Sequence, residues 1–136
     1  DEEFHLGGSK VIRSGKDITI ATYGDIVFQA LEAAEELAKS GIDAEVIDLY
    51  SVKPLDYATV RSSVEKTGRL LGPEDHQKRN GIGYELAAYF LREYPIPFDH
   101  MGLEDTFAES GSYYKLIEKY GLSSAHIVER AQRLIK

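Results

Sequence analysis

Between residues 14 and 54, the spacing of apolar and polar residues changes from strand-like to helix-like and back to strand-like. Residues 17–23 alternate apolar and polar side chains and carry several β-branched residues, which predicts a strand. Gly24-Asp25 interrupts this run and offers Asp25 as a helix N-cap. Apolar residues then recur at helical spacing, Gly41 is a natural helix end, and residues 46–49 supply a second strand. Two strands joined through a helix lie parallel, so this stretch predicts the start of an α/β sheet.

The remainder of the chain continues the alternation of strands and helices. Ser14-Gly15-Lys16 predicts a hairpin turn that would make the first short strand an antiparallel edge. The predicted elements are a strand at 10–13, a helix from Asp56 to about Lys66, a strand beginning at 69–71, a helix at about 83–94, a strand at 98–103, and closing helices at about 113–120 and 123–136.

This order predicts the fold class. A hairpin followed by βαβαβαβ and two helices is typical of a three-layer αβα sandwich on a mostly parallel five-stranded sheet with one antiparallel edge strand. Gly72-Pro73 cuts the third parallel strand short, because proline cannot donate to a ladder, so that strand is expected to end or bulge there. Residues 74–80 are then expected to form a loop.

Length and composition limit the class of protein. The 136 residues suit one domain, with residues 1–8 as an incoming linker and 9–136 as the domain. A net charge of −7 disfavours a nucleic-acid binder. The absence of cysteine excludes disulfides and thiolate metal sites and fits a reducing cytoplasm. No apolar run approaches the roughly 20 residues that span a bilayer, and we expect no signal peptide within this sequence. Because the chain begins at Asp1 without methionine, we expect it to be processed or cut from something longer.

The densest group of titratable residues is Glu74-Asp75-His76, followed by Arg79. It comes at the carboxyl end of a predicted strand, where open α/β sheets bind their ligands. Three interpretations stay open for this segment: a loop or interface contact, an anion or effector contact, and general acid–base chemistry. A metal site is poorly supported, because adjacent loop residues rarely converge on one ion.

Gly81-Ile82-Gly83 follows this group and precedes a helix. Two glycines at a helix N-terminus resemble part of a dinucleotide-binding fingerprint. However, Leu86 takes the place of the third glycine, and the motif follows the third parallel strand instead of the first. The alternative is a tight turn that lets the helix pack closely on the sheet, with Gly81 and Gly83 part of the same candidate anion or interface loop.

Several motifs in order resemble the C-terminal domain shared by transketolases, deoxyxylulose-phosphate synthases and the β subunits of 2-oxoacid dehydrogenases. They cover nearly the whole chain and are Gly15-Lys16-Asp17, Ile47-Asp48-Leu49, Lys53-Pro54-Leu55-Asp56, Glu74-Asp75-His76, Gly81-Ile82-Gly83 and Phe107-Ala108-Glu109-Ser110-Gly111. Residues 105–111 together with 116–122 look most like the short transketolases that are split into two chains.

The resemblance implies a role for the chain within a larger enzyme. Transketolases transfer a two-carbon ketol unit between sugar phosphates, as in the pentose phosphate pathway, with thiamine diphosphate and magnesium held by other domains. The Gly-Asp-Gly and Asn-Asn signatures of the diphosphate-binding domain are missing here. The resemblance therefore implies no catalytic, cofactor-binding or metal residue in this chain. It implies a cytoplasmic homodimer in which the chain packs against the remaining domains or subunit and is inactive alone.

Two alternatives remain open beside the transketolase interpretation. One is the corresponding domain of a deoxyxylulose-phosphate synthase or of a 2-oxoacid dehydrogenase β subunit. The other is a free-standing α/β ligand-binding module that has the same fold.

Overall fold

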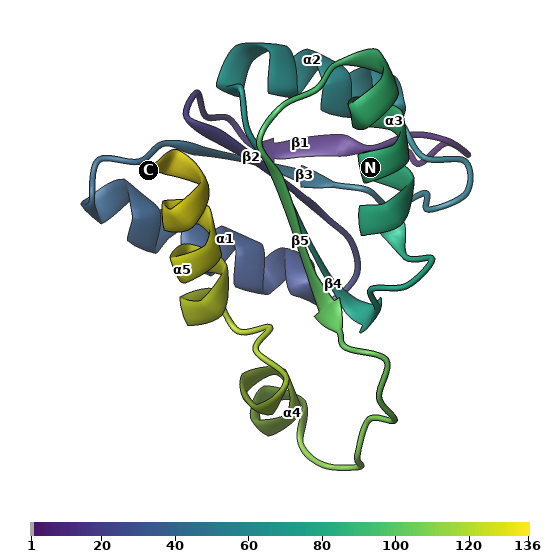
Figure 1. Ribbon diagram of the computed structural model, residues 1–136, viewed down its shortest axis with the longest axis vertical. Helices are drawn as coiled ribbons and strands as arrows, with labels where there is room; N and C mark the ends of the chain where they lie inside the picture. Colours follow the sequence, from purple (N-terminus) through teal and green to yellow (C-terminus); the bar gives the residue numbers. More distant parts are fainter. Residues whose placement is uncertain (1) are drawn as a thin grey trace.

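A computed structural model describes residues 2–136; Asp1, the first residue of the predicted linker, lies outside the described part. Its sheet has the strand order β1-β3-β2-β4-β5, in which β1 alone runs antiparallel to its neighbour (Figure 1). The strands are β1 (Lys10–Arg13), β2 (Ile18–Thr22), β3 (Ala44–Asp48), β4 (Leu70–Gln77) and β5 (Phe98–Leu103). The predicted fold class, a mostly parallel five-stranded sheet with one antiparallel edge strand, is confirmed.

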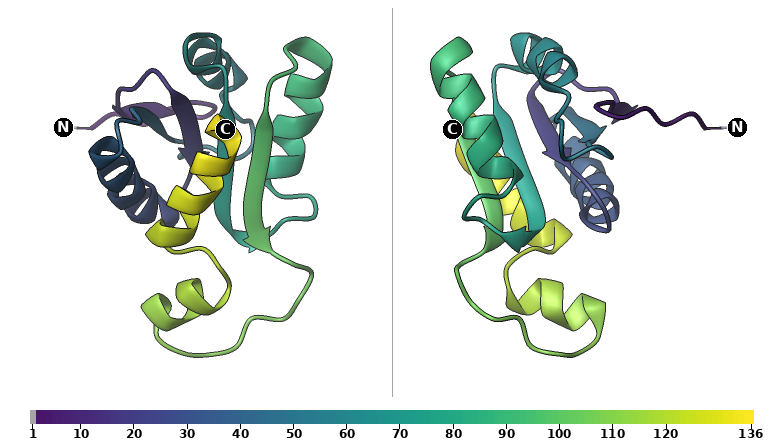
Figure 2. Two further views of the ribbon diagram at one scale, coloured as in Figure 1. Left: turned by 60° about the vertical axis from the view of Figure 1, so that its left-hand side comes forward. Right: turned by 90° about the vertical axis from the view of Figure 1, so that its right-hand side faces the viewer.

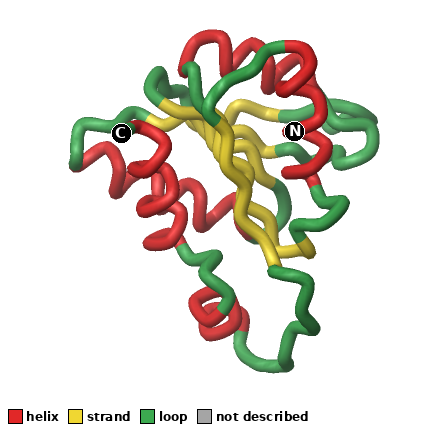
Figure 3. The backbone as a smooth tube through the Cα atoms, viewed as in Figure 1, coloured by secondary structure: helices red, strands yellow, loops and turns green. Residues whose placement is uncertain are grey.

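Helices cover both faces of the sheet, as Figure 2 shows. On one face α1 (Ile26–Lys39) packs against α5 (Ser124–Ile135), and on the other lie α2 (Tyr57–Thr67) and α3 (Ile82–Glu93). A short helix, α4 (Tyr113–Lys119), follows a long irregular connection from β5 (Figure 3). The three layers therefore agree with the predicted sandwich.

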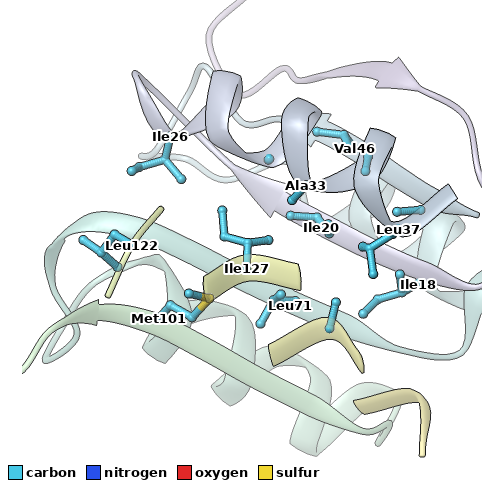
Figure 4. Packing of buried hydrophobic residues seen from close by; sticks show 14 of the residues in the cluster. Ile18, Ile20, Ile26, Ala33, Leu37, Val46, Leu71, Met101, Leu122 and Ile127 are labelled. Carbon is cyan, nitrogen blue, oxygen red and sulfur yellow. The ribbon is translucent and has the colours of Figure 1, made fainter. Parts of the chain in front are cut away.

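Each face of the sheet has its own apolar core, because the parallel strands are buried on both sides. All five residues of β2 are buried, and its side chains alternate between the two cores. Figure 4 shows Ile127 of α5 pointing into the core between α1 and the sheet. The opposite core contains Val60 and Val64 of α2 and Leu86 and Phe90 of α3.

The helix ends follow the predicted signals with one exception. The Asp56 carboxylate accepts a hydrogen bond from the Thr59 amide at 3.0 Å and so caps α2. Gly68 ends α2 with φ +74°, and Gly41 follows α1 with φ +79°, a backbone conformation that glycine adopts without a steric penalty. The prediction for Asp25 was wrong in one respect, because this residue precedes α1 but its side chain makes no cap hydrogen bond.

The predicted hairpin between the first two strands is wrong. β1 pairs with β3, with Lys10 opposite Asp48 and Val11 opposite Ile47. It cannot pair with β2, because both edges of β2 are hydrogen bonded to β3 and β4. Instead the chain crosses over β3 at Gly15, where a Cβ atom would overlap the backbone of β3. The glycine therefore serves a close crossing instead of a hairpin turn.

The prediction for Gly72-Pro73 was partly correct. β4 stops pairing with β2 after Leu71, and its register with β5 shifts between Pro73 and Gln77. The Pro73 carbonyl accepts a hydrogen bond from the Thr22 hydroxyl at 2.6 Å. However, the strand continues to Gln77, so residues 74–77 are strand and only residues 78–81 form the connection to α3. This extension places the predicted loop residues on the sheet.

Candidate functional site

The crevice between the carboxyl ends of β2 and β4 is the topological switch point of the sheet. The helices that follow these neighbouring strands, α1 and α3, lie on opposite faces, which opens a crevice where α/β proteins bind ligands. A cleft of about 810 Å³ occupies this position. Its lining comes from Tyr23 after β2, the loop after β3, the start of α2, the end of β4 with the connection that follows it, and the first turn of α3. Besides Tyr23, the lining residues include Val52, Lys53, Leu55, Tyr57, Glu74, Asp75, His76, Gln77, Arg79, Gly81, Ile82 and Glu85.

Glu74 is the buried polar centre of this cleft, with none of its surface exposed. Its carboxylate accepts hydrogen bonds from the Tyr23 hydroxyl at 3.1 Å, the Ile82 amide at 3.3 Å and the Gly83 amide at 3.2 Å. Two of these donors are free amides of the first turn of α3, which has no intrahelical partners for them. Glu74 therefore caps α3 from a neighbouring strand, at the positive end of the helix dipole.

Burial dominates the electrostatics of this centre. Burial raises the pKa of Glu74 above its usual range, although the amides of Gly83 and Ile82 and the hydroxyl of Tyr23 favour the carboxylate form. Burial also raises the pKa of Tyr23 well above its ordinary value, and the nearby charge and hydrogen bond of Glu74 add to this effect. The Tyr23 hydroxyl thus stays protonated and donates to Glu74 at any physiological pH.

The two glycines before and within α3 are needed for close packing. A Cβ atom at Gly81 would overlap the Glu74 carboxylate, and one at Gly83 would overlap the His100 ring. The amides of Ile82 and Gly83 already donate to the Glu74 carboxylate, so these two amides are not free to bind a phosphate. The geometry corresponds to the tight turn that the sequence offered as the alternative to nucleotide binding.

The predicted group of titratable residues does not converge on one point. Glu74 is buried, Asp75 is half-buried and His76 is largely exposed, so the three side chains do not share one environment. The His76 Nδ1 atom lies 3.1 Å from the Asp75 carboxylate, and the His76 ring meets the Tyr23 ring edge-on at 5.6 Å. Arg79 is exposed at the rim.

The cleft does not fit thiamine diphosphate. A diphosphate would meet the buried Glu74 carboxylate where the helix amides are, and like charges in a buried site are costly.

Within residues 2–136, no group of three or more His, Asp or Glu side chains is placed to hold a metal ion. In the same residues, no helix has the length and apolar character needed to cross a bilayer.

Comparison with known proteins identifies the family. The family model described as "Transketolase, C-terminal domain" matches residues 7–127. The chain belongs to this family. The 6-deoxy-6-sulfo-D-fructose transketolase subunit of a Clostridium species is 39% identical over 134 residues, which is 98% of this chain and 42% of that protein. The pyruvate dehydrogenase E1 component subunit beta of Bacillus subtilis is 48% identical over 90 residues, 65% of this chain and 28% of that one.

A solved structure has the same fold over the whole domain. The chain is similar to a split gene transketolase described as an inactive beta4 tetramer, with a TM-score of 0.92 and 37% identity. This likeness covers 99% of the present chain and 43% of the other. The transketolase C-terminal domain described here therefore spans less than half the length of the relatives it matches.

Sequence reasoning missed Tyr23 and Tyr57 as members of the cleft of this transketolase C-terminal domain. Tyr23 directly follows β2 and donates to Glu74, and Tyr57 begins α2 and donates to Glu85 at 3.2 Å. A topological signal was available, because residues that follow parallel strands meet at one edge of the sheet. Had the residues after every predicted parallel strand been considered, and not only those after the third, Tyr23 would have been identified.

Proposed function

We propose that this chain is the non-catalytic C-terminal domain of a transketolase that transfers a two-carbon ketol unit between sugar phosphates, and that it contributes to the assembly of a homodimer. The observation that carries the proposal is the likeness to the split gene transketolase over nearly the whole chain. In this proposal residues 1–8 are the incoming linker and 9–136 are the domain, and the enzyme acts in the cytoplasm.

The geometry of the cleft supports a role outside the chemistry. Its one fully buried acid, Glu74, is bound by donors of its own domain. The half-buried Asp75 and the largely exposed His76 contact each other at 3.1 Å. Thiamine diphosphate and magnesium would be held by the other domains or subunit of the parent enzyme, where the cofactor would supply the carbanion chemistry of ketol transfer. The exposed residues of the segment from Glu74 to Gly83 would contact those partners at the rim of the cleft.

The test is ketol transfer by the native parent protein, with its partner subunit if the enzyme is split. Xylulose 5-phosphate and ribose 5-phosphate are supplied with thiamine diphosphate and magnesium. We expect activity in the intact parent, loss of activity and of the dimer when residues 1–136 are deleted, and no activity from residues 1–136 alone. Activity that survives the deletion with the dimer intact would refute the assembly role.

The similarity to a pyruvate dehydrogenase E1 β subunit favours one alternative, a domain of a 2-oxoacid dehydrogenase. A parallel assay with pyruvate in place of the sugar phosphates separates the two, because that enzyme class consumes pyruvate and leaves sugar phosphates unchanged. Turnover of pyruvate without ketol transfer would replace the transketolase assignment.

A further inference from the structure

Four exposed apolar residues lie around two adjoining hollows at the carboxyl ends of β2 and β3. The lining of the hollow of about 470 Å³ includes Phe28, Tyr50 and Val52, with Asp48 as its charged member. The hollow of about 400 Å³ is lined by Phe4, Leu6, Tyr50 and Val52 together with the polar residues His5, Ser51 and Lys53. Because both hollows share Tyr50 and Val52, one continuous surface, which we name the N-terminal apolar face, is formed by Phe4, Leu6, Phe28, Tyr50 and Val52. Its members come from the first residues of the chain, the first turn of α1 and the loop after β3.

The N-terminal apolar face exposes several large apolar side chains. Phe28 is 67% exposed and Leu6 86%, and Phe4 and Val52 are also exposed. Taking about 200 Å² for an aromatic side chain, the four expose on the order of 500 Å², which reaches the size of patches that are often functional on monomers. The switch-point cleft adjoins this face through Tyr23 and Val52, which line both. An apolar centre beside polar cleft residues is the usual anatomy of a protein interface.

The first residues of the chain are fixed to this same face. The Gly7 amide donates to the Ser51 hydroxyl at 2.9 Å, and the Phe4 ring meets Tyr50 edge-on at 4.8 Å. The pairing of Lys10 with Asp48 places the entry to β1 at the end of β3. From there the first residues run outward from the domain (Figure 2). Any polypeptide joined ahead of residue 2 is therefore tethered beside the N-terminal apolar face.

We propose that the N-terminal apolar face docks the domain that precedes this chain in the parent polypeptide. The inference rests on the proposed function, in which this chain is the C-terminal part of a longer enzyme. The relatives of this chain are more than twice its length, so a parent protein of similar length would contain such a further domain. Tethering by a short segment gives that domain a high effective concentration at this face, so even a modest apolar contact stays closed.

Cysteine labelling of the parent protein tests this docking. This chain has no cysteine, so Phe28→Cys or Val52→Cys introduces one thiol whose peptide is followed by mass spectrometry. Leu91→Cys is the matched control, because Leu91 is 79% exposed and lies in the last turns of α3, away from the N-terminal apolar face. Each native rate is divided by the rate in denaturant, which removes differences in intrinsic thiol reactivity.

We expect Phe28→Cys and Val52→Cys to label at least tenfold more slowly than Leu91→Cys, at every protein concentration. Labelling as fast as the control overturns the proposal. Protection that disappears on dilution to the monomeric parent also overturns it, since the occupant is then a second copy. The ketol-transfer assay is independent of this result: protected thiols in a parent without ketol transfer refute the proposed function alone, and unprotected thiols in an active parent refute the docking alone.

Discussion

Replacing Glu74 should destabilise the domain more than any replacement of an exposed acid. The side chain is fully buried and accepts three hydrogen bonds, two of them from buried amides of α3. In Glu74→Ala the Ile82 and Gly83 amides lose their acceptor, and a buried donor without a partner costs about 1–3 kcal/mol. We expect Glu74→Ala to lower the free energy of unfolding by about 2–5 kcal/mol.

Glu74→Gln is the finer perturbation, because it keeps the shape and removes the charge. The glutamine oxygen can accept from the donors at one carboxylate oxygen, which leaves its amino group facing the remaining donor. One unsatisfied donor predicts a loss of about 1–3 kcal/mol. Glu85→Gln is the control: it is the same change in the first turn of the same helix, but Glu85 is exposed, so a loss within about 0.5 kcal/mol is expected.

The dependence of the Glu74→Gln effect on pH follows from the direction of the pKa shift. Burial raises the folded-state pKa of Glu74 above its value in the unfolded chain, so the folded chain holds this proton to higher pH. The resulting stability is fully present below the unfolded pKa, near 4.5, and is lost as pH rises through the folded pKa. The loss caused by Glu74→Gln should therefore be largest in acid and smaller at neutral pH.

Urea unfolding followed by circular dichroism, from about pH 4 to pH 8, measures these differences. The other titrating groups are common to both proteins, so their contributions cancel in the difference between wild type and Glu74→Gln. A loss that grows as pH rises would refute the reasoning, since the amides of α3 would then outweigh burial and the pKa would be lowered. A loss equal to that of Glu85→Gln would refute the capping role itself.

Three further predictions concern packing and polar contacts, each checked by the same unfolding measurement. Gly83→Ala should lower the free energy of unfolding by about 1–3 kcal/mol, because the new Cβ overlaps the His100 ring of β5. At Gly72 a new Cβ meets only an ordinary contact of 3.7 Å, so Gly72→Ala should cost less than half as much, and equal losses would contradict the overlap. Arg130→Leu removes the two hydrogen bonds of Arg130 to Asp99 of β5, at 2.6 and 2.8 Å, and should lower the free energy of unfolding by about 1–3 kcal/mol. Arg133→Leu removes an exposed ion pair and should cost less than about 0.5 kcal/mol; the reverse order of the two losses would refute this prediction. Thr19→Val should lower the free energy of unfolding by about 1–3 kcal/mol, because the buried hydroxyls of Ser63 and Thr67 in α2 lose the Thr19 hydroxyl, which lies 2.6 and 2.7 Å from them. No change in stability would show that those two hydroxyls satisfy each other.

Much of the fold could be predicted because its elements carry local signals. The capping aspartate at Asp56, the glycines at Gly41 and Gly68 and the β-branched run of β2 each specify a boundary from a few neighbouring residues. The strand at 98–103 agrees with β5 at both ends. Alternation of these elements then requires parallel strands with helical crossovers, whatever the details of packing.

The candidate site was predictable only in part. The sequence located Glu74-Asp75-His76, followed by Arg79, as the densest titratable group, but it did not indicate that Glu74 faces inward or that Tyr23 meets it. That arrangement depends on the continuation of β4 past Pro73, which is decided by pairing with β5 at Gln77. Pairing between strands about 25 residues apart leaves no local pattern in the sequence.

By itself the sequence determined the order of helices and strands, the three-layer class and the family resemblance, because these depend on local periodicity and on motifs in order. Only the tertiary structure decided that β1 pairs with β3 instead of β2, that Glu74 caps α3 and that apolar residues from three segments form one face. Each of these is a contact between segments distant in the chain. Such contacts are selected by the burial and hydrogen bonding of the whole domain, which no short stretch of sequence contains.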